Sequence, residues 1–250
     1  MSRRLEELDW SDTPMGELTL RRRRDPVVDV DVFEVKLGED FLMSSLFTVA
    51  EIALSRLALA QLDDEPLDVV VGGLGLGYTA TAALDDPRVR SLLVVERLAP
   101  VIDWHERGLI PAAVPPSSRV RLVNDDFFAM AAGAGFDPGE PQRRFHAILL
   151  DVDHSPRHLL NPAHAWLYTD EGAAHLHSRL VPGGVFALWS NDPPDESYLQ
   201  SLQGSFDSAW WEIIEFDNPL QSRTATNTIY LAHVASAGER PFSRKGSATR

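Results

Sequence analysis

The stretch from Leu67 to Glu96 constrains the fold of this chain more than any other part of the sequence. It reads LDVVVGGLGLGYTATAALDDPRVRSLLVVE, so the apolar run from Val69 to Val71 leads into a glycine-rich turn that ends at Gly77. A helical pattern follows, and a second apolar run ends on the acid Glu96. This order predicts strand, turn, helix and strand. In such a unit glycines let the backbone approach a bound nucleoside, and a carboxylate about 20 residues on accepts the ribose hydroxyls.

The glycine spacing narrows the type of nucleoside cofactor. NAD sites take G-x-G-x-x-G before the helix, whereas Gly73, Gly75 and Gly77 form G-x-G-x-G. The tighter spacing favours an adenosyl-sulfonium cofactor, which has no pyrophosphate to place on the helix N-terminus. A turn that only packs a helix against a strand is the alternative, and the position of Glu96 makes it the less favoured interpretation.

Composition excludes several classes of partner and site. The chain has 250 residues, which fits one large domain or one domain with a small appendage. Its net charge of −14 repels phosphates, so we expect no nucleic-acid partner and no anionic membrane partner. There is no cysteine, which excludes disulfides and thiolate zinc sites. No window approaches 18 apolar residues, and we expect a soluble cytoplasmic protein.

The N-terminal 43 residues have a pattern of their own. Residues 1–16 are polar, and we expect a loosely held arm there. Alternating apolar and polar residues then predict a small antiparallel β unit, with a bulge where the alternation changes phase between Val32 and Phe33. The arginine run from Arg21 to Arg24 could bind phosphate, but cross-strand ion pairs are the favoured interpretation. The acids available for these pairs are Asp29, Asp31 and Glu34.

A helix is predicted directly after this β unit. Ser44 and Ser45 are good N-caps for a helix that runs to about Leu62. Glu51 lies beside the apolar stripe of this helix, so its carboxylate is either solvated or turned toward a ligand cleft. The stripe expected to face the core consists of Leu46, Val49, Ala53, Leu57 and Ala60.

From Leu67 onward the pattern alternates between strand and helix. Two last strands have no helix between them and predict an antiparallel hairpin at the sheet edge. The fold class is therefore α/β: a Rossmann-like, doubly wound, mostly parallel seven-stranded sheet with a C-terminal antiparallel hairpin, plus a small N-terminal antiparallel β unit. Strands are predicted at 68–73, 91–96, 119–123, 144–150, 183–190, 211–217 and 225–234, and helices at 76–85, 98–108, 126–133, 168–180 and 195–209.

Three segments follow from this division. We expect the N-terminal arm and small β unit at 1–43 and the Rossmann-like transferase domain at 44–234. Residues 235–250 are rich in serine, glycine, alanine and arginine, and we expect a disordered tail there.

Acids follow most of the predicted parallel strands. Ligands of a doubly wound sheet lie outside the carboxyl ends of its strands, so these acids are candidates for a site. Asp125, Asp126 and Asp192 can also be explained as helix N-caps. Asp151 follows the apolar run Ile148-Leu149-Leu150, and a carboxylate at the end of a buried strand needs a partner or a task.

With these residues, the chain resembles the spermidine synthase-like (polyamine aminopropyltransferase-like) members of the class I S-adenosylmethionine-dependent fold. The likeness runs from about Gly16 to Val234 and includes the N-terminal β unit, which implies a homodimer or higher homo-oligomer. It rests on the glycine loop, the acid Glu96 and the aspartate motif Asn124-Asp125-Asp126-Phe127. It continues through Asp151-Val152-Asp153-His154-Ser155-Pro156, Pro162-Ala163 and Leu167-Tyr168.

The resemblance implies a set of cofactor-binding residues. Glu96 would hold the ribose, Asp125 would take the adenine amino group beside Asp126, and Asp151 would lie next to the reacting end. The implied cofactor is S-adenosylmethionine or its decarboxylated form, and no metal is expected. The loop glycines that would cradle it are Gly72, Gly73, Gly75 and Gly77.

The resemblance also implies catalytic and acceptor-binding residues. Asp151, with Asp153 nearby, would take a proton from the attacking group. Glu51 and His154 would contact the acceptor. In the family's Asp-x-x-Asp-Pro stretch the second aspartate is replaced here by His154, with an acid displaced to Asp153.

Besides His154, two departures separate this chain from the family pattern. Family synthases carry an aspartate in Gly-Gly-Gly-Asp-Gly-Gly that holds the aminopropyl amine, and Gly75 stands there. A glycine removes the repulsion toward the carboxylate of intact S-adenosylmethionine and offers an N–H instead. The family's Tyr-His-Glu triplet falls on Val49-Ala50-Glu51, so only the glutamate is kept. The common methyltransferase acid, two residues before the first glycine, is also missing because Val71 stands there.

These observations leave four hypotheses. The favoured one is an S-adenosylmethionine-dependent methyl transfer to a small-molecule acceptor, with the reactants positioned by the enzyme and Asp151 as proton acceptor. The alternative is a polyamine aminopropyltransferase (spermidine synthase) that uses the decarboxylated cofactor, against which Gly75 counts. A non-catalytic adenosine-binding scaffold is less favoured. So is a metal-dependent O-methyltransferase with oxygen ligands from Asp151 or Asp153 together with Asn191 and Asp192.

The histidines and one tryptophan complete the candidates. Trp189 lies near the end of its strand and is interpreted either as a core residue or as a residue that borders the acceptor pocket. We interpret the histidines as solvated or hydrogen-bonded side chains rather than zinc ligands. They are His154, His158, His164, His175 and His177.

Overall fold

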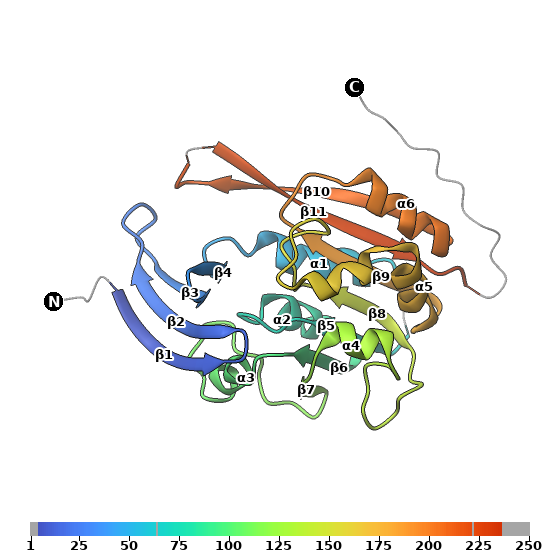
Figure 1. Ribbon diagram of the computed structural model, residues 1–250, viewed down its shortest axis with the longest axis horizontal. Coiled ribbons are helices and arrows are strands. Elements are labelled where there is room, and N and C mark those ends of the chain that lie inside the picture. Colours follow the sequence, from blue (N-terminus) through green and yellow to red (C-terminus); the bar gives the residue numbers. More distant parts are fainter. Residues whose placement is uncertain (1–4, 64, 222, 237–250) are drawn as a thin grey trace.

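The computed structural model describes residues 5–63, 65–221 and 223–236. These residues form two sheets: a four-stranded antiparallel sheet at the N-terminal end and a seven-stranded, mostly parallel sheet with helices on both faces (Figure 1). The predicted α/β fold class is confirmed, including the C-terminal antiparallel hairpin and the separate N-terminal β unit. The predicted tail lies outside the described residues from 237 onward.

The four strands of the small sheet pair in chain order. The expectation of a loose arm at 1–16 is wrong for its described part, because the first strand pairs along its whole length with the second. The bulge expected between Val32 and Phe33 is also wrong, and one register shift lies instead between Val35 and Lys36. Glu34 is buried, although the alternating pattern predicts that only apolar residues of this strand face inward. The strands are β1 (Leu5–Thr13), β2 (Gly16–Arg24), β3 (Asp31–Leu37) and β4 (Asp40–Ser44).

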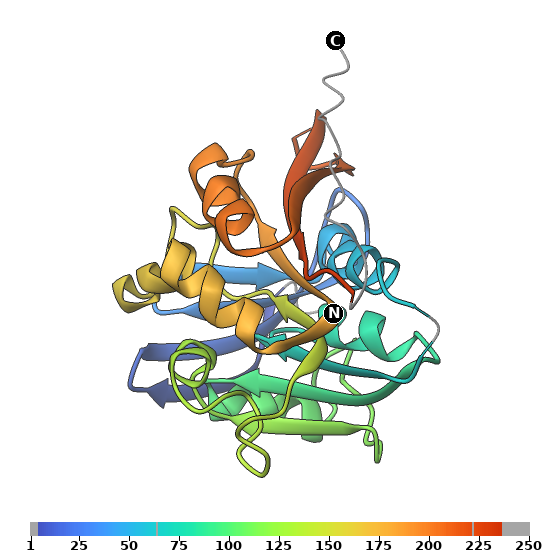
Figure 2. The same cartoon turned by 90° about the vertical axis from the view of Figure 1, so that its right-hand side faces the viewer.

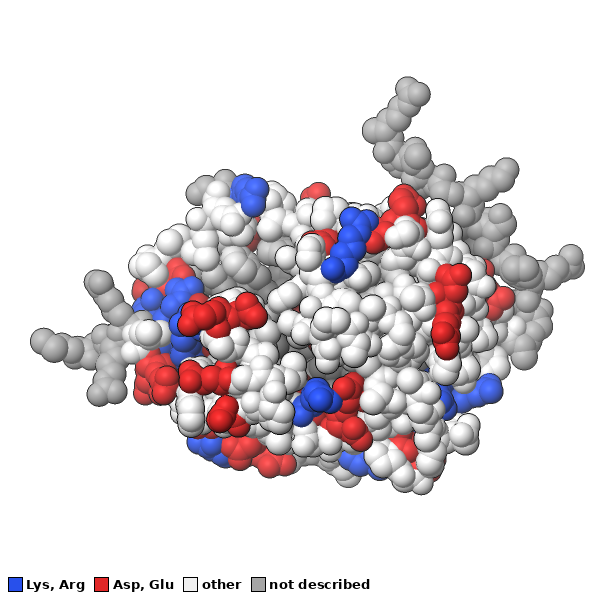
Figure 3. All heavy atoms as spheres, viewed as in Figure 1, with Lys and Arg blue, Asp and Glu red and all other residues white. Residues whose placement is uncertain are grey.

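The arginines of β2 form the predicted cross-strand ion pairs. Arg21 and Arg23 each donate through Nε to a different oxygen of Glu34, at 2.7 and 2.6 Å. Positive and negative side chains are accordingly intermixed at this end of the molecule (Figure 3). The other ion pairs of these arginines are Arg22 with Glu6, Arg23 with Asp25, and Arg24 with Asp29 and Asp31.

The helix after the small sheet begins later than predicted, since α1 spans Val49–Leu59. Ser44 is the last residue of β4, and the hydroxyl of Ser45 accepts a hydrogen bond from the N–H of Phe33 at 2.9 Å. Both serines therefore belong to the end of the small sheet, and the residue at the N-cap position of α1 is Thr48. The predicted apolar stripe is also wrong, because Val49 is 49% exposed. The residues that α1 buries are Ala50, Leu54, Ser55, Ala58 and Leu59.

The large sheet has the strand order β10-β11-β9-β8-β5-β6-β7. Its five strands from β9 to β7 are parallel, whereas β11 runs antiparallel to both β9 and β10, which confirms the predicted edge hairpin. The strands are β5 (Leu67–Gly72), β6 (Val89–Glu96), β7 (Val120–Asn124), β8 (Phe145–Leu150), β9 (Leu180–Ser190), β10 (Ser208–Asn218) and β11 (Arg223–His233).

Helices cover both faces of this sheet (Figures 1 and 2). The alternation of side chains along β5 explains the two cores: Val69 and Val71 pack with α1, α2 and α3, and Val70 packs with α4, α5 and α6. A short 3₁₀ helix, η1 (Pro162–Tyr168), precedes α5. The other helices are α2 (Tyr78–Leu84), α3 (Ala99–Glu106), α4 (Phe127–Ala132), α5 (Asp170–Ser178) and α6 (Glu196–Ser205).

The strand order places a switch point beside β5. The chain runs from β5 outward to β6 and β7, and then returns to the other side of β5 as β8. Open α/β sheets bind ligands in the crevice at such a point, outside the carboxyl ends of the strands. The glycine turn after β5 and Asp151 after β8 lie there. Separately, none of the helices in the described ranges combines the length and apolar character needed to cross a membrane.

Candidate active site

The glycine loop after β5 touches two other segments. A Cβ atom at Gly73, whose φ is +91°, would lie 2.1 Å from the carbonyl oxygen of Asp151, so this position requires a glycine. At Gly75, with φ +48°, a Cβ would instead lie 2.7 Å from the sulfur of Met43, a flexible side chain of the small sheet. The loop is thus held between β8 and the N-terminal sheet.

Glu96 lies beneath this loop at the end of β6. One carboxylate oxygen accepts a hydrogen bond from the N–H of Leu74 at 3.0 Å, and the other accepts from the N–H of Leu98 at 2.7 Å. Its burial raises the pKa of the carboxyl group, against the lowering effect of these N–H groups. The N–H groups of Gly75 and Arg97 also lower this pKa through hydrogen bonds, so the carboxylate is surrounded by backbone donors.

Two cavities open at the carboxyl ends of the strands. The inner cavity, of about 90 Å³, lies between the small sheet, the glycine loop, Glu96, α4 and the segment before η1. The outer cavity, of about 350 Å³, lies between β4, α1, the glycine loop and the β10–β11 hairpin. Five residues line both cavities and so connect them, namely Leu42, Met43, Gly75, Asp151 and Val152.

Two carboxyl groups face the outer cavity. Asp151 follows β8, and its Oδ2 accepts a hydrogen bond of 2.6 Å from the hydroxyl of Thr79 on α2. Burial raises the pKa of Asp151 to about 6, against the lowering effect of the Thr79 bond. Burial, followed by the charge of Asp151, raises the pKa of Glu51 to about 8. Among the described residues that line this cavity, none is lysine or arginine.

Asp153 does not join this pair. It is buried, and its carboxylate accepts hydrogen bonds from the N–H of Leu160, from Nδ1 of His164 and from the hydroxyl of Tyr168. It lines neither cavity. The predicted second catalytic acid is therefore turned away from both cavities, because three donors of its own loop hold it. His154, by contrast, lines the outer cavity as the acceptor contact requires.

The two aspartates after β7 have different places. Asp126 lines the inner cavity, where it caps α4 by accepting from the N–H groups of Phe128 and Ala129 and pairs with Arg97 at 2.6 Å. Asp125 is exposed, and its carboxylate accepts from the N–H of Asp126 at 2.7 Å. Asp125, predicted to take the adenine amino group, thus does not line the cavity.

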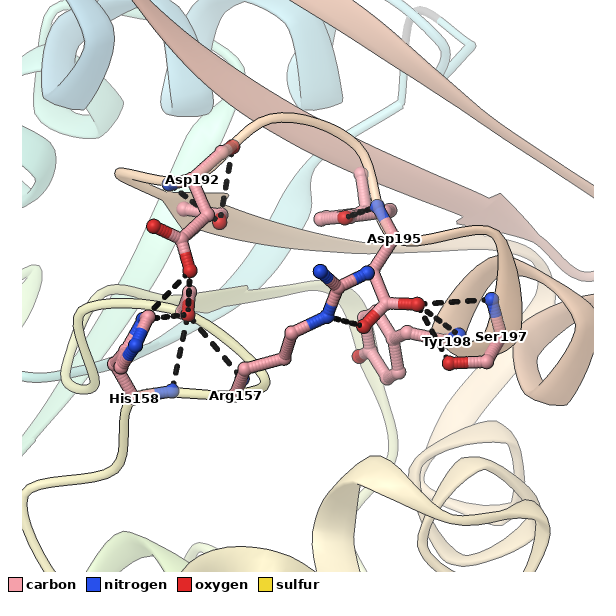
Figure 4. Close-up of polar contacts among 9 residues, drawn as sticks. Arg157, His158, Asp192, Asp195, Ser197 and Tyr198 are labelled. Carbon is pink, nitrogen blue, oxygen red and sulfur yellow. Dashed lines mark hydrogen bonds and ion pairs between the residues drawn. The ribbon is translucent and has the colours of Figure 1, made fainter.

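The ligand set of a metal-dependent O-methyltransferase is not assembled. Asp192 Oδ2 accepts from the hydroxyl of Ser155 at 2.6 Å and contacts Nδ1 of His158 at 2.7 Å (Figure 4). Asn191 contacts Asn227 through its side chain. Within the part of the chain that the structure describes, no three histidine, aspartate or glutamate side chains come together to hold a metal.

The outer cavity also contains residues with little signal in the sequence. Trp189 lines it, in agreement with one of its two interpretations, and its indole N–H is buried without a hydrogen-bond partner in the described residues. Phe47 before α1 and Phe216 on β10 pack their rings at 5.7 Å and both line the cavity. Met43 and Thr79 were not predicted, because their roles depend on contacts between segments far apart in the sequence.

Comparisons with known proteins agree with the fold. No protein-family model matches the sequence, and no curated protein matches it. Among solved structures, spermidine synthase from Thermotoga maritima is similar with a TM-score of 0.69 and 14% identity, over 91% of this chain and 72% of that one. A spermidine synthase in complex with the transition state analogue AdoDATO gives 0.68 and 13%, with the same coverage.

A third solved structure belongs to the same group. A probable spermidine synthase from Corynebacterium glutamicum is similar with a TM-score of 0.63 and 20% identity, over 97% of this chain and 83% of that one. At these identities the likeness establishes the fold, which is that of the solved spermidine synthases.

Proposed function

We propose that this chain is a transferase that moves an alkyl group from an adenosyl-sulfonium donor to an amine. The inner cavity takes the adenosine, with Glu96 on the ribose, and the outer cavity takes the amine. The observation that carries this proposal is the pair of carboxyl groups of Glu51 and Asp151, which share the outer cavity without a cation among the described lining residues. Half-buried carboxyl groups without a positively charged partner favour a ligand that brings a positive charge.

The two raised pKa values suit such a ligand. At neutral pH, Asp151 is mostly ionised and Glu51 is mostly protonated. An ammonium group that enters the cavity lowers both pKa values, so the second carboxylate ionises as the cation binds. Binding of the amine and charging of the cavity therefore support each other, and a neutral or anionic acceptor gains nothing from this arrangement.

The chemistry follows from these positions. Asp151 takes a proton from the ammonium and leaves a free amine whose lone pair attacks the carbon next to the sulfonium. A carbon–nitrogen bond forms, the carbon–sulfur bond breaks, and its electron pair neutralises the sulfur to a thioether. Most of the rate comes from holding the nitrogen in line with the reacting carbon, while proton removal contributes about 10²–10⁴-fold.

The favoured donor is decarboxylated S-adenosylmethionine, which makes the reaction an aminopropyl transfer. The carboxylate of the intact cofactor would face Glu51 and Asp151 with no arginine or lysine among the described outer-cavity residues to balance it. Several solved spermidine synthases share the fold, one of them with a transition state analogue. A short diamine is the favoured acceptor, because its two ammonium groups match the two carboxyl groups of the outer cavity by charge.

Methyl transfer from intact S-adenosylmethionine is the second candidate, and Gly75 is the observation that favours it. The resemblance implies an acid at this position for an aminopropyl donor, and this chain has none. The side chain of Met43 occupies that space.

Turnover with each donor distinguishes the two candidates. The enzyme is mixed with a diamine and either donor, and the nucleoside by-product is identified by mass spectrometry. We expect 5′-methylthioadenosine from the decarboxylated donor, and binding of that donor at least about tenfold tighter than the intact one by calorimetry. Glu51→Gln should raise the KM for the diamine about tenfold. Glu171→Gln, an exposed first-turn glutamate on α5, is the matched control.

The opposite outcome is equally clear. S-adenosylhomocysteine as the only by-product, with tighter binding of the intact donor, establishes methyl transfer and removes the aminopropyl proposal. In that case Gly75→Asp, placed in a Met43→Ala background to make room, should erase the preference for the intact donor. If neither donor binds, both candidates fail and a scaffold role leads.

A further inference from the structure

His164 is fixed in the wall of the inner cavity. It lies on η1, is 5% exposed and lines the cavity beside α4. Its ring stacks on that of Phe128, with centroids 3.5 Å apart and planes 6° apart. The stack fixes the plane of the ring.

Nδ1 of the ring is engaged by a neighbouring carboxylate. Nδ1 of His164 lies 2.9 and 3.0 Å from the two oxygens of Asp153. The same carboxylate accepts from the N–H of Leu160 and the hydroxyl of Tyr168, both at 2.8 Å. Burial, followed by the charge of Asp153, raises the pKa of Tyr168 well above its ordinary value, so this hydroxyl keeps its proton and donates. The oxygens of Asp153 act as acceptors toward these two donors, and Nδ1 in contact with both oxygens is the third donor and carries a hydrogen.

The other nitrogen is left for a ligand. The two ring nitrogens point away from each other, and Asp153, on the Nδ1 side, does not line the cavity that His164 lines. No hydrogen bond within the described residues involves Nε2. In the neutral ring with its hydrogen on Nδ1, Nε2 presents a lone pair and accepts.

The other polar groups nearby are already engaged. Asp126 caps α4 and pairs with Arg97, and the carboxylate of Glu96 accepts from the N–H groups of Leu74 and Leu98. The expected base-reading residue, Asp125, is exposed and lies outside the cavity. Among the described side chains that line this cavity, His164 therefore offers a rigid acceptor, Nε2, without a partner. Asp151 also lines the cavity, but at its junction with the outer cavity.

We propose that Nε2 of His164 accepts a hydrogen bond from the 6-amino group of the donor's adenine and so selects the base. This inference rests on the proposed function, which places an adenosyl donor in the inner cavity. The 6-amino group is the one hydrogen-bond donor of the adenine ring system, and it matches an acceptor. Hypoxanthine carries an oxygen at that position, which would oppose the lone pair of Nε2.

The test compares three nucleosides on three proteins by calorimetry. The probes are adenosine, inosine, which has an oxygen at position 6, and purine riboside, which has hydrogen there. The proteins are wild type, His164→Asn and His164→Gln. Asparagine keeps an N–H toward Asp153 but has no atom at the place of Nε2, whereas glutamine brings an amide oxygen there and loses the bond to Asp153. Melting temperatures show whether each variant is folded.

Wild type should bind adenosine about tenfold more tightly than purine riboside, and inosine more weakly still. His164→Asn should bring the three affinities within about twofold, and His164→Gln should keep part of the preference for adenosine. A residue that only shapes the loop would weaken all three probes equally. The proposal is overturned if His164→Gln loses the preference for adenosine while His164→Asn retains it. That result would show that the preference depends on the hydrogen bond to Asp153.

The failures of this inference and of the proposed function differ. If wild type prefers adenosine and His164→Asn keeps that preference, another group reads the base and only the inference fails. If wild type binds adenosine and purine riboside equally, position 6 is not read at all, and the inference also fails while the adenosyl site stands. If wild type binds none of the nucleosides and neither sulfonium donor, the proposed function fails and the inference with it.

Discussion

Glu51 shows how one residue links function to stability. Its pKa is raised in the folded protein, so the folded state holds a proton that the unfolded chain releases near its ordinary pKa of about 4.3. Stability therefore falls as the pH rises from that value toward about 8. Sites that bind charge often carry such a cost, because the group is placed for its ligand and not for the fold.

Glu51→Gln should therefore stabilise the protein at neutral and higher pH. We expect a rise in Tm of about 2–6 °C at pH 8 that disappears below about pH 4, where wild type is protonated in both states. Thermal unfolding from pH 4 to 9 measures this difference. A constant difference at every pH would show that the gain comes from packing and not from the charge.

Thr79 should set the pH at which the enzyme becomes active. Its hydroxyl stabilises the ionised form of Asp151, so Thr79→Val should raise the pKa of this carboxyl group. The acidic limb of the kcat/KM profile should move up by about 0.5–1 pH unit. Thr19→Val, on the small sheet, is the control. An unshifted limb would mean that Asp151 is not the group whose ionisation the profile reports.

The sequence predicted some of these residues and missed others for a physical reason. The glycine loop, Glu96 and Asp151 were found because each lies at the end of a strand whose pattern is strong. Asp153 was misplaced, because alternation cannot show that a neighbouring histidine and tyrosine surround a carboxylate. His164 had no signal beyond its position in a loop, since its role depends on a stack with Phe128 on another element.

At the scale of elements, hydrogen bonds join strand β1 to helix α3 and the residue that follows it. The carboxylate of Asp9 accepts from the indole N–H of Trp104 and from Arg107, both at 2.8 Å. Trp104 is fully buried, so its N–H has no access to water if this acceptor is removed. The contact holds the small sheet over the inner cavity.

Removing this acceptor should destabilise the protein. Asp9→Ala leaves a buried indole N–H unsatisfied, which costs about 1–3 kcal/mol and should lower Tm by about 2–12 °C. Asp12→Ala, at an exposed position on the same strand, is the matched control and should change Tm little. Equal effects of the two variants would contradict this role for Asp9. Differential scanning fluorimetry is sufficient for the measurement.

A network of ion pairs lies near the amino ends of strands β5, β7 and β8. Asp137 is buried and pairs with Arg121 and Arg143, and Arg143 also contacts Asp68. Burial raises the pKa of Asp137, but the hydrogen bonds from the two arginines outweigh it and hold the pKa at about 2. This contribution is complete above the unfolded pKa of about 3.9 and is lost as the pH falls toward about 2.

Asp137→Asn should lower stability most at neutral pH. We expect a loss of about 2–4 kcal/mol, because two arginines lose their shared carboxylate. The difference from wild type should shrink as the pH falls below about 4, and chemical denaturation at pH 7 and pH 3 measures both values. An equal loss at both pH values would assign the effect to altered packing.

Elements were predicted best where burial is two-sided. Strands β5 and β8 read as continuous apolar runs, and their predicted bounds differ from the observed ones by one residue. Helix α1 was predicted poorly, because Ser44 and Ser45 look like helix caps and yet satisfy the end of a sheet. Strand β1 was missed for a similar reason, since an edge strand with acids and few apolar residues carries little alternation.

At the scale of the whole molecule, residues of both sheets form the candidate site. The large sheet contributes the glycine loop and Asp151, and the small sheet contributes Leu42 and Met43 to both cavities. That the chain forms a homodimer or higher homo-oligomer stays a prediction, which light scattering measures directly. We expect at least twice the monomer mass of 27.7 kDa. A monomer at micromolar concentration would contradict it.

The contact between Gly75 and Met43 also bears on how sequences of this kind change over time. An aspartate tolerates the left-handed backbone of Gly75 better than most residues, and its obstacle is the end of a side chain, whereas at Gly73 the obstacle is backbone. A lineage can therefore move between a glycine and an acid at position 75 if the end of the Met43 side chain shifts, whereas Gly73 cannot change without moving the backbone of Asp151. Of the two glycines, only position 75 is thus open to substitution as the donor used by a descendant changes.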